Sequence, residues 1–343
     1  MRLTFSTVLL FAVVIIFTAC KKSSNSTTPA PVVTPPVSTG ELIFNTGFEA
    51  GTGMVATSGQ YAEFRGMDAS VSKPNDWIND FVSHPNIGIW RIYYEQGDSS
   101  QRLASIVADP VNPANKVLNY KINMPHIDVP LSSQYTVNGL LFNKKARIQA
   151  DMYGNNGLKE IYQSIRLFIP TDFNKYINSV YPGNGDWLTL FEFWNNASWV
   201  TANYNFRFGV NLEKGTSAIG SPLYFKAEGQ KFTTAYTQVW VNKNISYPVP
   251  IGKWMTLEYY IKEGNTANGR FYFAVTPEGG AKTVVFDLPV ATSHPDDPAP
   301  DGLTEINPIK LYTSNNMVNQ LNTMGGTLQV YWDDFKFWKN KKP

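Results

Sequence analysis

Two adjacent carboxylates lie inside an aromatic segment of the chain. The segment YWDDFKFW, residues 331–338, has the composition of a buried strand, yet it contains Asp333 and Asp334. A buried carboxylate is costly unless a cation or a metal compensates its charge. The pair therefore predicts one of three arrangements: an ion pair with Lys or Arg, a metal site, or an open cleft in which an aspartate takes part in catalysis.

Glu192 is the most suggestive single acid, because it lies between aromatic residues in LFEFWNN, residues 190–196. Glycosidases use two carboxyl groups on either side of the scissile bond, and Glu258 is the candidate for the second. Trp194 and Trp199 are close to Glu192 in sequence, and both are suited to stack on sugar rings. The alternative is that Glu192 only forms an ion pair with an arginine of a neighbouring strand.

The elements that must position these side chains are β-strands. Short apolar runs alternate with polar residues, helical periodicity is hard to find, and turn-like clusters such as GNGD, NTANG and PEGG separate the runs. Strands joined in this way, without regular helices between them, predict two packed antiparallel sheets. The expected strands are 41–49, 88–96, 116–124, 145–153, 161–169, 187–194, 204–213, 254–263, 269–276, 283–288 and 327–338.

The strands expected at 161–169, 204–213 and 254–263 each have one apolar face and one face with Arg, Asn, Tyr or Glu. The residues predicted to face the core are Ile161, Ile165, Leu167, Ile169, Tyr204, Phe206, Phe208, Val210, Leu212, Met255, Leu257, Tyr259 and Ile261. The opposite faces carry Tyr162, Arg166, Phe168, Arg207, Glu258 and Tyr260. Solvation is the simplest explanation of such a face, but Arg and Asn mixed with aromatic residues also suit a surface that binds sugars.

Several segments resemble the concanavalin A-like jelly rolls of bacterial polysaccharide-active proteins, in particular the polysaccharide lyases of that fold. They are FNTGFE, IRLFIPTDF, LFEFWNN, the hairpin GKWMTLEYYIKEG…GRFYFAV and YWDDFKFW, and they span most of 41–338. The hairpin and the closing strand are common to many lectin-like domains, so they indicate fold more than function. The resemblance implies an all-β jelly-roll β-sandwich of two antiparallel sheets that acts on an extracellular polysaccharide.

The chain departs from the motifs of the best-known members of this fold. The alginate lyases carry R-T-E-x-R, Q-I/V-H and Y-F-K-x-G-x-Y strands, whereas this chain has no Q-x-H segment. LYFKAEG, residues 223–229, matches only part of the third motif, in a different part of the chain order, and the E-x-D-x-x-E strand of laminarinase-like hydrolases is absent. A named substrate therefore does not follow from the resemblance.

A lyase that acts on uronic acids needs a group that neutralises the substrate carboxylate, a base that removes the C5 proton, and an acid for the leaving oxygen. Arg166, Asn195 and Arg207 are the candidates for the first role, because Arg and Asn donate hydrogen bonds to an oxyanion in a fixed geometry. Tyr260 or His294 would transfer the proton. The alternative for the two arginines is a cross-strand ion pair with a glutamate.

Three functions remain open from the sequence. The first is an exported polysaccharide lyase that cleaves a uronic-acid-containing polysaccharide by β-elimination. The second is a non-catalytic surface glycan-binding lipoprotein that uses Tyr162, Trp194, Trp199 and the same arginines. The third is a glycoside hydrolase that uses Glu192 and Glu258.

The resemblance also bears on the aspartate pair. In domains of this type the first and last strands often lie side by side, which would bring Glu49 near Asp333 or Asp334. Carboxylates gathered in this way suit Ca²⁺, which would stabilise the fold. We therefore expect either a structural calcium ion or an ion pair at the aspartates, and no organic cofactor.

Residues 1–20 have the features of a lipoprotein signal peptide. An apolar run after Arg2 ends in FTAC, which resembles the lipobox of bacterial lipoproteins, with Cys20 as the lipidated residue. Residues 21–40 are rich in Ser, Thr and Pro, as expected of a tether, and the jelly-roll domain would occupy 41–343. The pairing resembles the glycan-degrading lipoproteins of Bacteroidetes-type bacteria. We expect an outer-membrane lipoprotein that faces the periplasm or the cell surface.

The composition limits the partners of the chain. The formal net charge is +2, and no long basic run occurs outside the last few residues, so a nucleic-acid partner is not expected. Cys20 is the only cysteine, which excludes a disulfide within the domain. About three hundred residues without a second linker predict one large β-domain, which we expect to be a monomer.

Overall fold

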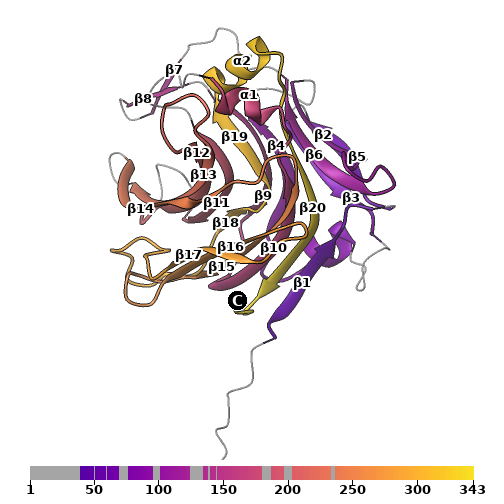
Figure 1. Cartoon of the computed structure of the whole chain (residues 1–343). Coiled ribbons are helices and arrows are strands. Elements are labelled where there is room, and N and C mark those ends of the chain that lie inside the picture. The colour runs from indigo at the N-terminus through magenta and orange to yellow at the C-terminus, as the bar shows by residue number, and fades with distance from the viewer. Residues whose placement is uncertain are drawn as a thin grey trace, which may run out of the picture. The chain divides into compact units, whose positions relative to one another are not determined.

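Alternating hydrophobicity folds most of the chain into β-strands, as expected. The computed structural model describes residues 39–343 except 50, 59, 69–75, 96–100, 124–133, 138–139, 144, 180–186, 197–202 and 233–235. All eleven expected strands are present, and their ends differ from the expected ones by at most three residues. The strands form two large antiparallel sheets, called sheet A and sheet B here (Figure 1). The prediction of an all-β jelly-roll β-sandwich is confirmed.

Sheet A has eight strands among the described residues. Its order is β17 (Thr283–Leu288), β16 (Arg270–Pro277), β15 (Trp254–Lys262), β10 (Glu160–Phe168), β20 (Leu328–Lys339), β6 (Lys116–Ile122) and β5 (Arg102–Ala108). β1 (Glu41–Thr46) pairs with β20, so the first and last strands of the described chain lie side by side (Figure 1).

Sheet B has ten strands in the described part of the chain. Its order is β14 (Tyr236–Pro248), β13 (Leu223–Phe232), β12 (Phe206–Lys214), β11 (Leu188–Asn195), β18 (Glu305–Asn307), β9 (Lys145–Tyr153), β4 (Ile89–Glu95), β3 (Tyr61–Arg65) and β2 (Gly53–Ser58). β19 (Lys310–Ser314) follows β18 and also lies between β11 and β9. A separate hairpin consists of β7 (Gln134–Val137) and β8 (Leu140–Asn143).

The structure also contains short helices that the sequence analysis did not predict. They are the π-helix η1 (Trp77–Val82), α1 (Phe173–Ile177) and α2 (Asn315–Thr323), and α1 and α2 lie at the same end of the sandwich (Figure 1). α2 begins after Ser314, whose hydroxyl accepts a hydrogen bond from the Met317 amide. None of the helices in the described residues is both long and apolar enough to span a membrane.

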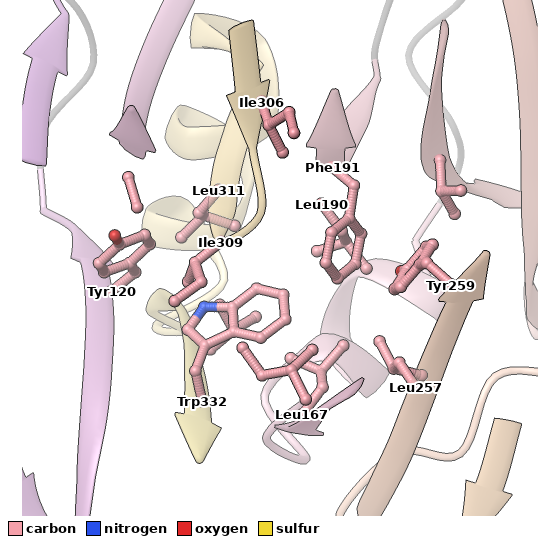
Figure 2. Close-up of a cluster of buried hydrophobic side chains, with 14 of the residues drawn as sticks. Tyr120, Leu167, Leu190, Phe191, Leu257, Tyr259, Ile306, Ile309, Leu311 and Trp332 are labelled. Carbon is pink, nitrogen blue, oxygen red and sulfur yellow. The ribbon is translucent and has the colours of Figure 1, made fainter. Parts of the chain in front are cut away.

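The core lies between the two sheets. The alternation predicted for β10, β12 and β15 is confirmed, since the residues predicted to face inward are buried, apart from Tyr204, which precedes β12 and is 39% exposed. Figure 2 shows the packing around Trp332 of β20, with Leu167 and Leu257 from sheet A and Phe191 from sheet B. The centroids of the Phe191 and Trp332 rings are 5.5 Å apart, edge to face. The outer faces of the two sheets therefore lie on opposite sides of this core.

β20 contains a β-bulge at the two aspartates. Opposite β10, Lys336 pairs with Ser164 and Asp333 with Arg166, so β20 has one extra residue over this stretch. Asp334 has a φ of 48°, a left-handed conformation that Asp adopts more readily than most residues. Because of the bulge, the Asp333 side chain is buried while that of Asp334 is 46% exposed.

Candidate active site

The outer face of sheet B carries a continuous set of charged and aromatic side chains. In β9, the residues Ala146, Ile148, Ala150 and Met152 are buried in the core, so the alternate positions face outward. The same alternation in β4, β11, β12, β18 and β19 completes the set. We call it the polar face; it comprises Arg91, Tyr93, Glu95, Arg147, Gln149, Asp151, Glu192, Arg207, Glu305, Asn307, Lys310 and Tyr312.

Glu192 and Lys310 form a buried ion pair at the centre of the polar face. The Lys310 ammonium is fully buried and donates hydrogen bonds to Glu192 Oε2 and, over 3.1 Å, to Asn307 Oδ1. Arg207 Nη1 lies 3.6 Å from the other oxygen of Glu192. Burial alone would raise the pKa of Glu192, but the two cations outweigh burial and lower this pKa to about 2.

Burial has the larger effect on the lysine of this pair. It lowers the pKa of Lys310 to about 8, although the Glu192 carboxylate favours the charged ammonium. The nearby Arg147 guanidinium acts in the same direction as burial. Lys310 is therefore a cation that can lose its proton much more easily than an exposed lysine.

Two further carboxyl groups share a partner beside this pair. The Asn307 amide donates to Asp151 Oδ1 and to Glu305 Oε1, in both cases over 3.0 Å. Burial, followed by the neighbouring Asp151, raises the pKa of Glu305 to about 7. Burial also raises the pKa of Asp151, against the effect of Arg147 and Arg91. Both carboxyl groups therefore keep a proton to a higher pH than exposed carboxyl groups do.

Tyr312 lies between two cations on the polar face. The Arg147 guanidinium is 5.3 Å and the Lys310 ammonium 5.1 Å from the centre of its ring. Arg147 also pairs with Glu95, over 2.7 Å, which fixes the guanidinium against β4. Unlike Lys310, Tyr312 is only half-buried, so it can contact a bound molecule.

Arginines at two positions of the polar face reach solvent. The Arg91 side chain is 31% exposed and lies 3.4 Å from Asp151, and the Arg207 side chain is 23% exposed. Arg207 also lies over the Trp194 and Tyr236 rings, 5.4 Å and 4.3 Å from their centres, and donates to Gln230 over 2.9 Å. Aromatic and amide partners hold the guanidinium in place and leave one side of it accessible.

The residues singled out from the sequence divide between the two sheets. Glu192, Trp194 and Arg207 lie on the outer side of sheet B. Tyr162, Arg166, Glu258 and Tyr260 lie on the outer side of sheet A. The two arginines therefore cannot hold one carboxylate, and Glu258 does not face Glu192. Strands with the same alternating pattern belong to different sheets, and the pattern alone does not reveal to which.

Three of these predicted residues form structural contacts. The Glu192–Arg207 contact is the ion pair that was the alternative for both residues. Trp194 is 2% exposed and lies beneath Arg207, so it offers no open ring face in this structure. Trp199 and Cys20 lie outside the described residues.

Tyr260 and Tyr162 are poor candidates for a base. The Tyr260 hydroxyl donates to Glu160 Oε1 over 2.9 Å, and the Tyr162 hydroxyl donates to Glu258. Burial, followed by these hydrogen bonds, raises the pKa of both phenols. A raised pKa keeps a phenol protonated, which opposes the role of a base.

Asn195 and His294 both belong to packed loop contacts. The Asn195 amide donates to Glu263 Oε1 over 2.5 Å and to the Gly302 carbonyl over 3.1 Å. His294 is 4% exposed, accepts a hydrogen bond from the Asp296 amide at Nδ1, and packs edge to face against Tyr204. Burial lowers the pKa of His294. These contacts fix loops at the end of the sandwich rather than aim either side chain at a substrate.

The aspartate pair is compensated by an arginine. Arg166 lies 3.4 Å from Asp333 and 3.7 Å from Asp334, and it also contacts Glu278 over 3.2 Å. Burial, followed by the charge of Asp334, raises the pKa of Asp333 to about 7. Of the alternatives that the sequence left open, the structure forms the ion pair.

The described residues contain no preformed cluster of metal ligands at the predicted calcium site. No group of three or more His, Cys, Asp or Glu side chains in the described residues is arranged to hold a metal ion. Glu49 Oε1 accepts a hydrogen bond from the Lys116 amide, and Asp333 Oδ2 accepts one from Asn115. Calcium at Glu49, Asp333 and Asp334 stays a prediction.

The sequence analysis missed most of the polar face. Arg147, Asp151, Glu305, Asn307, Lys310 and Tyr312 were not singled out. The signal was visible for β9, because KARIQADMY was an expected strand whose outward positions are polar. β18 and β19 are three and five residues long, and Pro308 separates them, so their alternation is too short to stand out.

Comparison with known proteins gives similarities of fold. No family model and no curated protein sequence matches the chain. One similar solved structure is the endo-β-1,4-glucuronan lyase of the fungus Trichoderma reesei, at 16% identity and a TM-score of 0.42 over 72% of this chain and 90% of that one. The PL-14 alginate lyase of Aplysia kurodai has 8% identity and a TM-score of 0.41 over 87% and 99%. Alginate lyase Aly36B has 13% identity and a TM-score of 0.35 over 62% and 85%.

Proposed function

We propose that the chain is a polysaccharide lyase that cleaves a uronic-acid-containing polysaccharide by β-elimination on the polar face of sheet B. The observation that carries the proposal is the position of Tyr312, half-buried between the Arg147 and Lys310 cations. Arg207 lies on the same face, beside the Glu192 carboxylate that also binds Lys310. A proton-transfer group among fixed cations is what elimination from a uronate requires.

In the proposed reaction, the guanidinium groups of Arg147 and Arg207 bind the substrate carboxylate and disperse the charge that develops when the C5–H bond breaks. Tyr312 takes the C5 proton and returns a proton to the leaving oxygen as the C4–O bond breaks. A C4–C5 double bond forms in one product, and the other product gains a hydroxyl. Lys310 keeps positive charge next to Tyr312 throughout.

The charge balance of the polar face suits an anionic polymer. Its cations are Arg91, Arg147, Arg207 and Lys310, and its carboxyl groups are Glu95, Asp151, Glu192 and Glu305. The numbers are equal, but Glu305, whose pKa is about 7, is partly protonated near neutral pH. Near neutral pH the face therefore has more positive than negative charge.

A glycoside hydrolase is the second candidate, with different residues from those expected. Glu192 has a pKa of about 2 and Glu305 a pKa of about 7, and they come from the neighbouring strands β11 and β18. One ionised and one protonated carboxyl group is the pattern of a glycosidase. The lyase is preferred because both oxygens of Glu192 are already engaged by cations.

The test is an assay of the soluble chain with a panel of acidic and neutral polysaccharides. Ultraviolet absorbance of unsaturated uronates and release of reducing ends are followed together. A lyase produces both on an acidic polymer, and Tyr312→Phe abolishes both. Reducing ends without absorbance, lost in Glu305→Gln, mean a hydrolase. Retarded migration on a polymer without cleavage means a glycan-binding protein.

We also propose that the chain is a lipid-anchored outer-membrane protein, attached through Cys20. The support is the lipobox-like FTAC after an apolar run and the Ser/Thr/Pro-rich tether that follows it. Growth of an expressing bacterium with a labelled fatty acid should label the protein, and Cys20→Ser should abolish the label. Labelling that persists in Cys20→Ser would contradict the anchor.

A further inference from the structure

A row of four aromatic residues crosses the outer face of sheet A. Tyr272 on β16 pairs with Tyr260 on β15, Tyr260 with Tyr162 on β10, and Tyr162 with Trp338 on β20. Because these residues are direct cross-strand partners, their side chains stand side by side on one face. With neighbouring strands about 4.8 Å apart, the row is about 14 Å long.

Cations lie over this row. The Lys341 ammonium is 3.8 Å from the centre of the Trp338 ring and 4.1 Å from that of Tyr162. Lys282 lies 5.6 Å from the centre of the Tyr272 ring. These contacts, together with Arg270 beside Tyr260 and Tyr272, leave the three tyrosines 2 to 6% exposed.

The lysines around the row are incompletely neutralised. Lys282 pairs with Glu258 over 2.8 Å, whereas Lys341 and Lys336 form no ion pair within the described part of the chain. Burial lowers the pKa of Lys341 and the Glu258 carboxylate raises it, while Lys282 and Lys336 lower it, so one carboxylate lies near three ammonium groups that repel one another. An anion placed among them would remove this repulsion.

We propose that this face of sheet A is a second polysaccharide-binding site, which holds anionic sugar residues away from the polar face of sheet B. An anionic sugar lies against the half-buried Trp338, and its carboxylate lies among Lys282, Lys336 and Lys341, which the buried aromatic row positions. The Glu258 carboxylate, which accepts from the Tyr162 hydroxyl, is the acceptor for a sugar hydroxyl. The identity of the ligand as the acidic polymer rests on the proposed function; the location of the site does not.

The two sites are separated by the core, so one polymer chain cannot lie flat on both faces. The second site would therefore retain the enzyme on an insoluble or entangled polymer while the polar face cleaves another chain. Such retention raises the effective concentration of substrate without changing the chemical step. Loss of the second site should therefore lower kcat/KM on long polymers and leave the cleavage of short oligosaccharides unchanged.

The experiment uses electrophoresis of the folded chain through gels that contain alginate, polygalacturonate or β-1,4-glucuronan, with a neutral polymer as reference. All proteins carry Tyr312→Phe, so that the gel polymer is not cleaved. The test variant is Lys282→Ala with Lys341→Ala, and the matched control is Lys253→Ala, an exposed lysine immediately before β15. We expect the test variant to bind the acidic polymers about five- to tenfold more weakly than the reference protein. The control variant should bind them as strongly as the reference protein does.

A kinetic experiment separates the two proposals. In the background with Tyr312 intact, the double lysine variant should cleave a tetrasaccharide as the unaltered chain does and should have a lower kcat/KM on the polymer. Unchanged retardation and unchanged polymer kinetics would overturn the second site while leaving the lyase intact. Lysine-dependent retardation without cleavage of any polymer would overturn the lyase and keep the site.

Two other results would overturn the second site. One is the absence of retardation by every acidic polymer. The other is binding that depends on Lys282 and Lys341 but occurs only with vesicles of anionic phospholipid, which would identify a membrane surface as the partner. Because both lysines are at the surface, loss of folding is not expected, and a thermal unfolding curve of each variant checks this.

Discussion

The buried Glu192–Lys310 pair makes a quantitative prediction about stability. Relative to ordinary values, the pKa of Glu192 falls from 4.5 to about 2 and that of Lys310 falls from 10.5 to about 8. The first shift favours the folded state with both groups charged, and the second opposes it by a similar amount, at about 1.4 kcal/mol per pKa unit. The pair as a whole should therefore contribute close to nothing to the free energy of unfolding.

Removal of only one of the two charged partners should destabilise the folded chain. Lys310→Met leaves the Glu192 carboxylate buried with Arg207 and the more distant Arg147 as its cations, and Glu192→Gln leaves a buried ammonium without its ion-pair partner. We expect each single variant to lose about 3 to 5 kcal/mol of unfolding free energy. The double variant, with both charges gone, should lose much less than the sum of the two and lie within about 1 kcal/mol of the unaltered chain.

The assay is guanidinium-induced unfolding of all four proteins at pH 7, followed by tryptophan fluorescence. The coupling free energy from the cycle should be at least about 2 kcal/mol in the stabilising direction. Additive losses would refute the reasoning, since they would mean that the two charges do not compensate each other. A loss below about 1 kcal/mol in Lys310→Met would refute the burial of the pair.

Other predictions concern activity, pH and calcium. Tyr312→Phe should abolish cleavage with little change in Tm, whereas Tyr260→Phe, on sheet A, should leave the rate of cleavage unchanged; a loss in both would contradict the location of the site. Because the folded-state pKa of Glu305 is raised to about 7, the chain should lose stability as pH rises from about 4.5 to about 7, and Glu305→Gln should flatten this slope in a series of melting curves. Arg166→Ala should lower the free energy of unfolding by about 1 to 3 kcal/mol in denaturant unfolding, because it leaves the buried Asp333 without its cation. It should leave kcat/KM on oligosaccharides unchanged, because both residues lie on sheet A, opposite the proposed active site. If calcium binds at the aspartates, a chelator should lower the Tm of the unaltered chain but not that of Asp333→Asn; equal shifts would speak against the calcium site.

Local pattern was enough to predict the strands and their inward faces. In β10 and β15 the alternation with a period of two fixes which residues are buried, and these residues are the ones found in the core. The same pattern cannot tell which strand pairs with which. Arg166 and Arg207 were assigned to one site because both suit a substrate carboxylate, and strand order puts them on opposite sheets.

The centre of the polar face illustrates what a single sequence hides. Lys310 follows a short strand and a proline, in a stretch where neither strand is long enough to show its alternation. Its partner Glu192 is 118 residues away, and only the pairing of β18 and β19 with β11 brings them together. Glu192 was recognised as a notable acid because an isolated carboxylate in an aromatic strand must be compensated, but the identity of its partner depends on topology.

The most direct test of the central claim is the initial rate of unsaturated-uronate absorbance on a short acidic oligosaccharide, whose cleavage does not depend on the second site. It is measured for the unaltered chain, for Tyr312→Phe on sheet B and for Tyr260→Phe on sheet A. The account predicts a rate for the unaltered chain and for Tyr260→Phe, and none for Tyr312→Phe. A rate that survives Tyr312→Phe and is lost in Tyr260→Phe would contradict it, because the elimination would then take place on sheet A.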